Sequence, residues 1–73
     1  MIPLTANKET LIQWACKHGQ INERKLRKQW GGLEVFCAQH SVGIATLLER
    51  IITYSNVGCD LKHSIMFAKK EWE

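Results

Sequence analysis

The chain has 73 residues, a formal net charge of +3, 45% hydrophobic residues and three cysteines. One domain of this length buries only about 60% of its unfolded surface, which leaves little material for the walls of an active-site cleft. No stretch approaches ~20 uninterrupted apolar residues, so we expect no membrane-spanning helix. We therefore expect a single helical domain over residues 1–73 that works by binding and needs no cofactor.

The first predicted helix ends near His18. Residues 1–6 are predicted to form an extended lead, because Pro3 disfavours helical geometry in the residue before it. Thr5 or Asn7 can cap the helix by accepting a hydrogen bond from a free amide at its start. Gly19 is predicted to end the helix as a left-handed residue.

A second, basic helix is predicted from Asn22 to Trp30. Asn22 is a favoured N-cap, and the pair Gly31-Gly32 is expected to stop the helix. Between Lys17 and Trp30 the chain has five basic residues and one acid, whereas the rest has five basic residues and six acids. The positive excess therefore lies in one short segment, which can form an electrostatic binding surface.

The longest apolar stretch runs from Leu33 to Tyr54. Its apolar residues recur in steps of four and three, which is the spacing of one helical face. Two arrangements fit the weak point at Ser41-Val42-Gly43: one long helix, or two helices, from Leu33 to about Gln39 and from about Ile44 to Tyr54. In either case the stretch is predicted to be the hub on which the other helices pack.

A last helix is predicted after Asp60, whose side chain can cap it. Its inner face is formed by residues in steps of four and three, namely Leu61, Ile65, Ala68 and Trp72. The predicted fold class is all-α: a small bundle of four or five short helices around a central apolar helix, without strands.

Each cysteine lies near a histidine in the sequence, as in Cys16 and His18, Cys37 and His40, and Cys59 and His63. Thiolate and imidazole groups are typical zinc ligands, but these pairs lie on separate predicted helices and do not match the spacing of zinc sites. We therefore expect no metal. An odd number of cysteines makes no closed disulfide framework, and the N-terminus lacks a signal-peptide pattern, so we expect reduced thiols in a cytoplasmic protein. No oxyanion loop or carboxylate pair accompanies the thiols, and we assign no catalytic residue.

The candidate site lies on the basic segment. Guanidinium, ammonium and amide groups suit phosphates and base edges. The candidate binding residues are Lys17, Gln20, Arg24, Lys25, Arg27, Lys28 and Gln29. Two partial helix-turn-helix patterns occur, one at the start of the basic helix and one at Ala38–Arg50. Both are displaced by one or two positions, so neither assigns the chain to a family.

We expect a non-enzymatic nucleic-acid-binding regulator that uses the basic helix. The alternative is an interaction module or inhibitor, as is common among accessory proteins of phages and mobile elements, that docks on a larger protein with an acidic surface. That alternative includes a homodimer, and Phe67 and Trp72 are its candidate interface anchors. A solvated basic face without any partner also fits the pattern.

Overall fold

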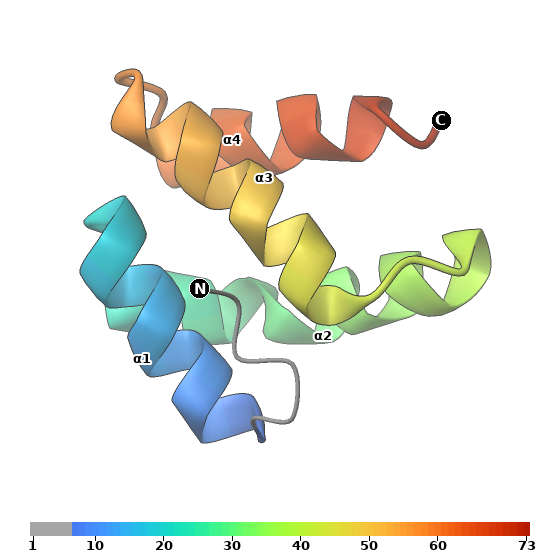
Figure 1. The fold of residues 1–73 in the computed structure, drawn as a ribbon, viewed down its shortest axis with the longest axis horizontal. Coiled ribbons are helices and arrows are strands. Elements are labelled where there is room, and N and C mark those ends of the chain that lie inside the picture. The colour runs from blue at the N-terminus through green and yellow to red at the C-terminus, as the bar shows by residue number, and fades with distance from the viewer. Residues whose placement is uncertain (1–6) are drawn as a thin grey trace.

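The computed structural model describes residues 7–73, and the extended lead predicted for residues 1–6 lies outside them. Four helices make up this part of the chain: α1 (Lys8–Gly19), α2 (Glu23–His40), α3 (Ile44–Asn56) and α4 (Leu61–Lys70). The predicted all-α bundle is confirmed, and the described residues contain no strand. Helix α3 crosses the middle of the molecule and packs on each of the other three helices (Figure 1).

Helix α1 begins at a predicted cap but ends differently. The Asn7 Oδ1 accepts a hydrogen bond from the Thr10 amide at 2.9 Å. The left-handed residue at the other end is Gln20, with a φ of 52°, while Gly19 is still helical. A Cβ at Gly19 would lie only 2.9 Å from Ile21 Cδ1 and 3.2 Å from Ile52 Cγ1. This glycine therefore serves a close approach between α1 and α3 rather than a turn.

Helix α2 begins at the predicted cap, where Asn22 Oδ1 accepts a hydrogen bond from the Lys25 amide at 3.1 Å. The prediction that it ends at Gly31-Gly32 is wrong, because the helix continues to His40. Two glycines cost a helix about 2 kcal/mol relative to alanines. The buried residues before and after them, however, form one continuous stripe: Leu26, Trp30, Leu33, Phe36 and Cys37. Packing of that stripe outweighs the local preference, since most helical stability in proteins comes from tertiary contacts.

The apolar stretch Leu33–Tyr54 is divided between two helices. Ser41 is left-handed, with a φ of 55°, and Gly43 takes the extended N-cap position of α3. The helices α2 and α3 are bent by 119° at this break. Of the two predicted arrangements the divided one is correct, but its first half is the continuation of the basic helix. The central apolar helix is α3 alone.

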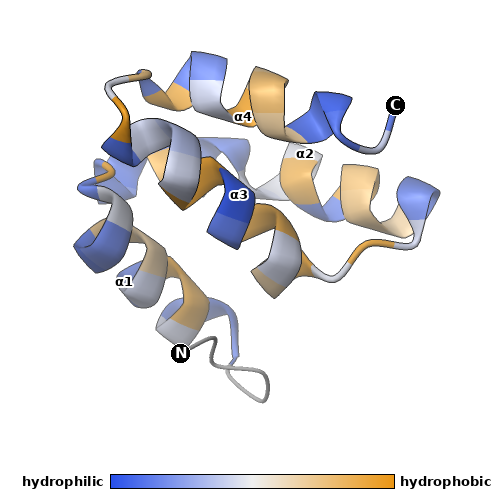
Figure 2. Ribbon diagram, turned by 45° about the horizontal axis from the view of Figure 1, so that its top comes forward, coloured by the Kyte–Doolittle hydropathy of each residue, from blue (hydrophilic) through white to orange (hydrophobic). Residues whose placement is uncertain are grey.

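The core takes large side chains from α1, α2 and α3, with a smaller share from α4. Figure 2 shows the apolar sides of the helices turned towards one another. The buried hydrophobic residues are Leu11, Ile12, Ala15, Ile21, Leu26, Trp30, Leu33, Phe36, Cys37, Leu47, Leu48, Ile51, Ile52, Ile65 and Ala68. Trp30 lies inside this core, whereas Trp14 and Trp72 are half-buried at its edge. Helix α4, capped by Asp60 as predicted, therefore leaves much of its circumference exposed.

No single helix in residues 7–73 is long and apolar enough to cross a membrane. Taken together, the bent pair of α2 and α3 has the length and composition of a membrane-spanning segment.

Candidate functional site

Arg27, one of the predicted binding residues, is engaged within the protein. Its guanidinium donates two hydrogen bonds to the Glu9 carboxylate of α1, at 2.6 and 3.1 Å, and a third to Glu23 at 3.0 Å. Gln13 of α1 also donates to Glu23, at 2.9 Å. These hydrogen bonds lower the pKa of both carboxyl groups and raise the pKa of Arg27. Arg27 thus links α2 to α1 through hydrogen bonds to Glu9 and Glu23.

The neighbouring basic residues of α2 lie along a different side of the helix. Lys25, Lys28 and Gln29 line a hollow of about 530 Å³, whose other wall is the start of α4 with Asp60, Leu61 and Lys62. Because α2 and α4 run in the same direction, the hollow can continue along both helices (Figure 1).

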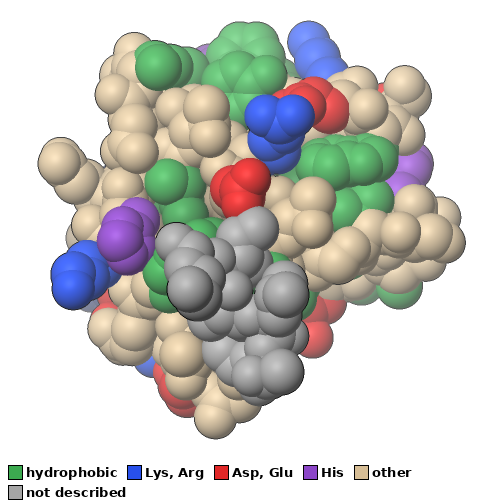
Figure 3. Space-filling view, in the orientation of Figure 1, with side chains coloured by type: hydrophobic (Ala, Val, Ile, Leu, Met, Phe, Trp, Pro, Cys, Tyr) green, Lys and Arg blue, Asp and Glu red, His purple; other side chains and the backbone are tan. Residues whose placement is uncertain are grey.

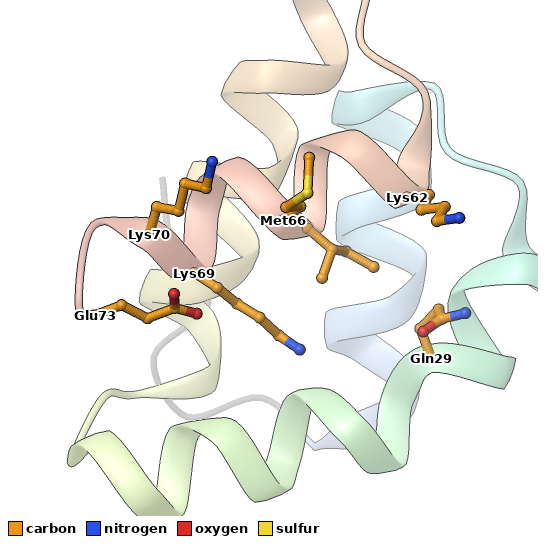
Figure 4. Close-up of a pocket in the computed structure, with 7 residues that line it drawn as sticks. Gln29, Lys62, Met66, Lys69, Lys70 and Glu73 are labelled. Atoms are coloured by element: carbon orange, nitrogen blue, oxygen red, sulfur yellow. The ribbon is translucent and has the colours of Figure 1, made fainter.

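A second hollow of about 240 Å³ extends this site towards the end of α4. Its lining residues are Gln29, Lys62, Ile65, Met66, Lys69, Lys70 and Glu73. Gln29 and Lys62 line both hollows, so the two form one continuous feature, which we call the α2–α4 groove. In Figure 4 the Lys69 side chain extends from α4 towards α2, and Gln29 and Lys62 face each other across the groove.

The α2–α4 groove is strongly cationic. Its lining includes five lysines, Lys25, Lys28, Lys62, Lys69 and Lys70, against two acids, Asp60 and Glu73. Within residues 7–73 none of these lysines forms an ion pair.

One of the two acids of the groove, Asp60, is hydrogen-bonded to the first turn of α4. The Asp60 carboxylate accepts hydrogen bonds from the His63 amide at 2.8 Å, and lies 2.8 Å from the His63 ring. The first of these bonds is the main reason that the pKa of Asp60 is lowered. Asp60 therefore acts as the cap of α4, and its carboxylate stays ionised beside the groove lysines.

Aromatic rings flank the groove. At its far end the Phe36 ring stacks on His40 with centroids 4.2 Å apart and meets Trp72 edge-on at 6.5 Å. The Lys69 ammonium lies 5.4 Å from the centre of the Phe36 ring, and Lys70 lies 5.6 Å from that of Phe67. Two of the five groove lysines are thus held beside aromatic faces, which attract cations.

The described residues of the α1 and α3 side present a mixed surface (Figure 3). Figure 3 views the side formed by α1 and α3, where the visible Lys and Arg side chains occur singly among acids and apolar groups. The single cationic residue of α3, Arg50, is paired with Glu71 of the segment after α4 at 3.1 Å.

The structure groups only part of the predicted set of binding residues. Lys25, Lys28 and Gln29 lie together in the groove, whereas Lys17 and Gln20 are exposed at the end of α1. Arg24 is exposed on α2 but does not line the groove.

Sequence reasoning missed the lysines on the other wall, Lys62, Lys69 and Lys70. A signal for them existed: positions 62 and 69 are two helical turns apart and therefore share a face, next to the apolar face of α4.

None of the three cysteines lines the groove. Cys37 is buried and Cys16 is half-buried, and burial raises the pKa of both thiols. In the part of the chain that the structure describes, no three His, Cys, Asp or Glu side chains are placed to hold a metal ion.

Comparisons of the chain with models of protein families, with curated proteins and with solved structures found no match. What the groove binds must therefore be inferred from its own charge and shape.

Proposed function

We propose that the chain is a non-catalytic nucleic-acid-binding regulator whose α2–α4 groove contacts the phosphate backbone. The observation that supports this function is a set of five lysines on two facing helices, none of which forms an ion pair with another described residue. Lysine ammonium groups are compact point charges that suit phosphates without reading the sequence. Compared with the sequence-based hypothesis, the site moves from the whole basic helix to one side of it together with α4.

Binding of this kind depends steeply on salt, because each lysine that neutralises a phosphate releases condensed counterions. If most of the five groove lysines contact phosphate, the logarithm of the binding constant falls with the logarithm of salt with a slope of about −3 to −4. Fluorescence anisotropy of labelled oligonucleotides across a salt series measures this slope directly.

A matched pair of double variants tests the location. Lys28→Gln with Lys62→Gln removes one charge from each wall of the groove, and Lys8→Gln with Lys17→Gln removes two exposed charges from α1. The groove variant should reduce the salt slope by about 2, while the α1 variant should leave it nearly unchanged. Equal losses in the two variants, or no binding by the wild-type protein at low salt, would refute the proposal.

A second candidate function is docking onto a larger protein with an acidic surface. It is supported by Met66, which lines the groove and is 43% exposed among the lysines. An apolar anchor surrounded by cations suits an acidic surface with one protruding apolar side chain. A complex with an acidic protein should survive nuclease treatment and be weakened by Met66→Asp. A complex with nucleic acid should instead be lost on nuclease treatment.

A further inference from the structure

A cluster of aromatic side chains lies beside the α2–α4 groove, on the outer side of α4 and the end of α3. The Phe67 ring lies 5.7 Å from Tyr54 and 6.3 Å from His63, with interplanar angles of 37° and 33°. Lys70, which lines the groove, also has its ammonium 5.6 Å from the Phe67 ring. We call Tyr54, His63 and Phe67 the aromatic patch, and Lys70 connects it to the groove.

Phe67 is not a core residue. The buried side of α4 consists of Ser64, Ile65 and Ala68, whereas Phe67 is 36% exposed and Met66 is 43% exposed. Its neighbour in the patch, His63, is exposed as well. A flat apolar ring at the surface, next to the groove lysines, provides the two elements that a nucleotide needs: a stacking face and a phosphate contact.

The helices that would read a duplex are poorly placed for it. The α2–α3 pair has the bend of a helix-turn-helix, but α3, its second helix, is packed against all three other helices. Among its outward residues, Arg50 is paired with Glu71 and Glu49 is an acid. On α2 beyond Lys28, the exposed Gly31, Gly32 and Val35 have no side-chain donor for a base edge, which leaves Gln39 and His40 at the end of the helix.

Given the proposed nucleic-acid function, on which this inference rests, we propose that the ligand is a single strand, with an unpaired base stacked on Phe67 and its phosphates along the groove lysines. In a duplex the base faces are covered by neighbouring pairs, so an exposed phenyl ring gains nothing from it. In a single strand each base offers a face, and stacking on an aromatic side chain is tolerant of sequence. Lys70 both lines the groove and lies over the Phe67 ring, so a strand along the groove passes next to that ring.

The test compares oligonucleotides of one mixed sequence at about 0.1 M salt: single-stranded DNA, single-stranded RNA, the DNA duplex, and an abasic strand that keeps the phosphates. Wild-type protein should bind at least one of the two base-bearing single strands at least about tenfold more tightly than it binds the duplex. Whichever of DNA or RNA binds more tightly identifies the source of the strand, and either result supports the inference.

Substitutions at Phe67 then separate stacking from charge. Phe67→Ala should weaken single-strand binding about five- to hundredfold and leave abasic-strand binding unchanged, while Phe67→Tyr should retain the wild-type affinity. Phe67→Leu keeps apolar bulk without the flat ring, and should behave like Phe67→Ala if stacking is the cause. Circular dichroism melts of each variant confirm that the fold is intact.

The outcomes distinguish single-strand binding by Phe67 from nucleic-acid binding by the groove lysines. Duplex binding equal to or tighter than single-strand binding, or a Phe67→Ala variant with unchanged affinity, overturns the single-strand inference while the groove lysines can still bind phosphate. Absence of binding to every oligonucleotide at low salt overturns both.

Discussion

The continuity of α2 through Gly31-Gly32 can be tested by replacing both glycines with alanine. Both residues are helical and exposed, both lack a positive φ, and a Cβ added at either would meet nothing within 4 Å. The substitutions therefore add no steric conflict. They remove only the extra backbone freedom that glycine has in the unfolded chain.

The expected magnitude follows from helix propensity. Alanine is favoured over glycine in a helix interior by about 0.8–1.0 kcal/mol, so the double variant should gain about 1.5–2 kcal/mol. For a domain of this size, each kilocalorie shifts the melting temperature by about 4–8 °C, which predicts a rise of about 6–16 °C.

Thermal and urea denaturation followed by circular dichroism at the helix wavelength measure this gain. Gly58→Ala is the matched control, because Gly58 has a φ of 106° that alanine adopts only with strain, and it should cost at least about 1 kcal/mol. If the Gly31 and Gly32 substitutions destabilise the protein as the Gly58 control does, the chain turns at the glycine pair and α2 is not continuous.

Three further predictions concern the fold. Asn22→Ala removes the cap of α2 and should lower the free energy of unfolding by about 1 kcal/mol, measured in urea. Glu9 and Glu23 have lower pKa values in the folded than in the unfolded protein, so they stabilise the fold at neutral pH and this stabilisation is lost as the pH falls through the folded pKa values. Arg27→Gln should therefore reduce the difference between the urea midpoints measured at neutral and at acidic pH. Leu47→Ala empties a fully buried position of α3 and should cost about 2–5 kcal/mol, visible as a large drop in melting temperature.

The helix starts were accessible from the sequence because a cap is a local interaction. Asn7, Asn22 and Asp60 each accept a hydrogen bond from an amide three residues later, and nothing distant takes part. The helix ends were less accessible. Gln20 and Ser41, not Gly19 and Gly43, take the left-handed conformation, because packing across the bundle decides where each helix stops.

The candidate site also contains residues that local sequence reveals and residues whose contacts depend on distant parts of the chain. Lys25, Lys28 and Gln29 could be found in sequence because they share one basic segment. Arg27 looked equivalent to them, but its principal partner Glu9 lies 18 positions earlier, so no local pattern shows that it is engaged.

What the sequence by itself determined is the helical class of the protein and the presence of a positive excess between residues 17 and 30, since both follow from composition and from local spacing. Only the tertiary structure decided which cations pair with acids and which line one groove. The 119° bend between α2 and α3 lets α4 return beside α2, and this brings Lys62, Lys69 and Lys70 opposite Lys25 and Lys28. The groove is a property of that packing, because its two walls lie more than thirty residues apart along the chain.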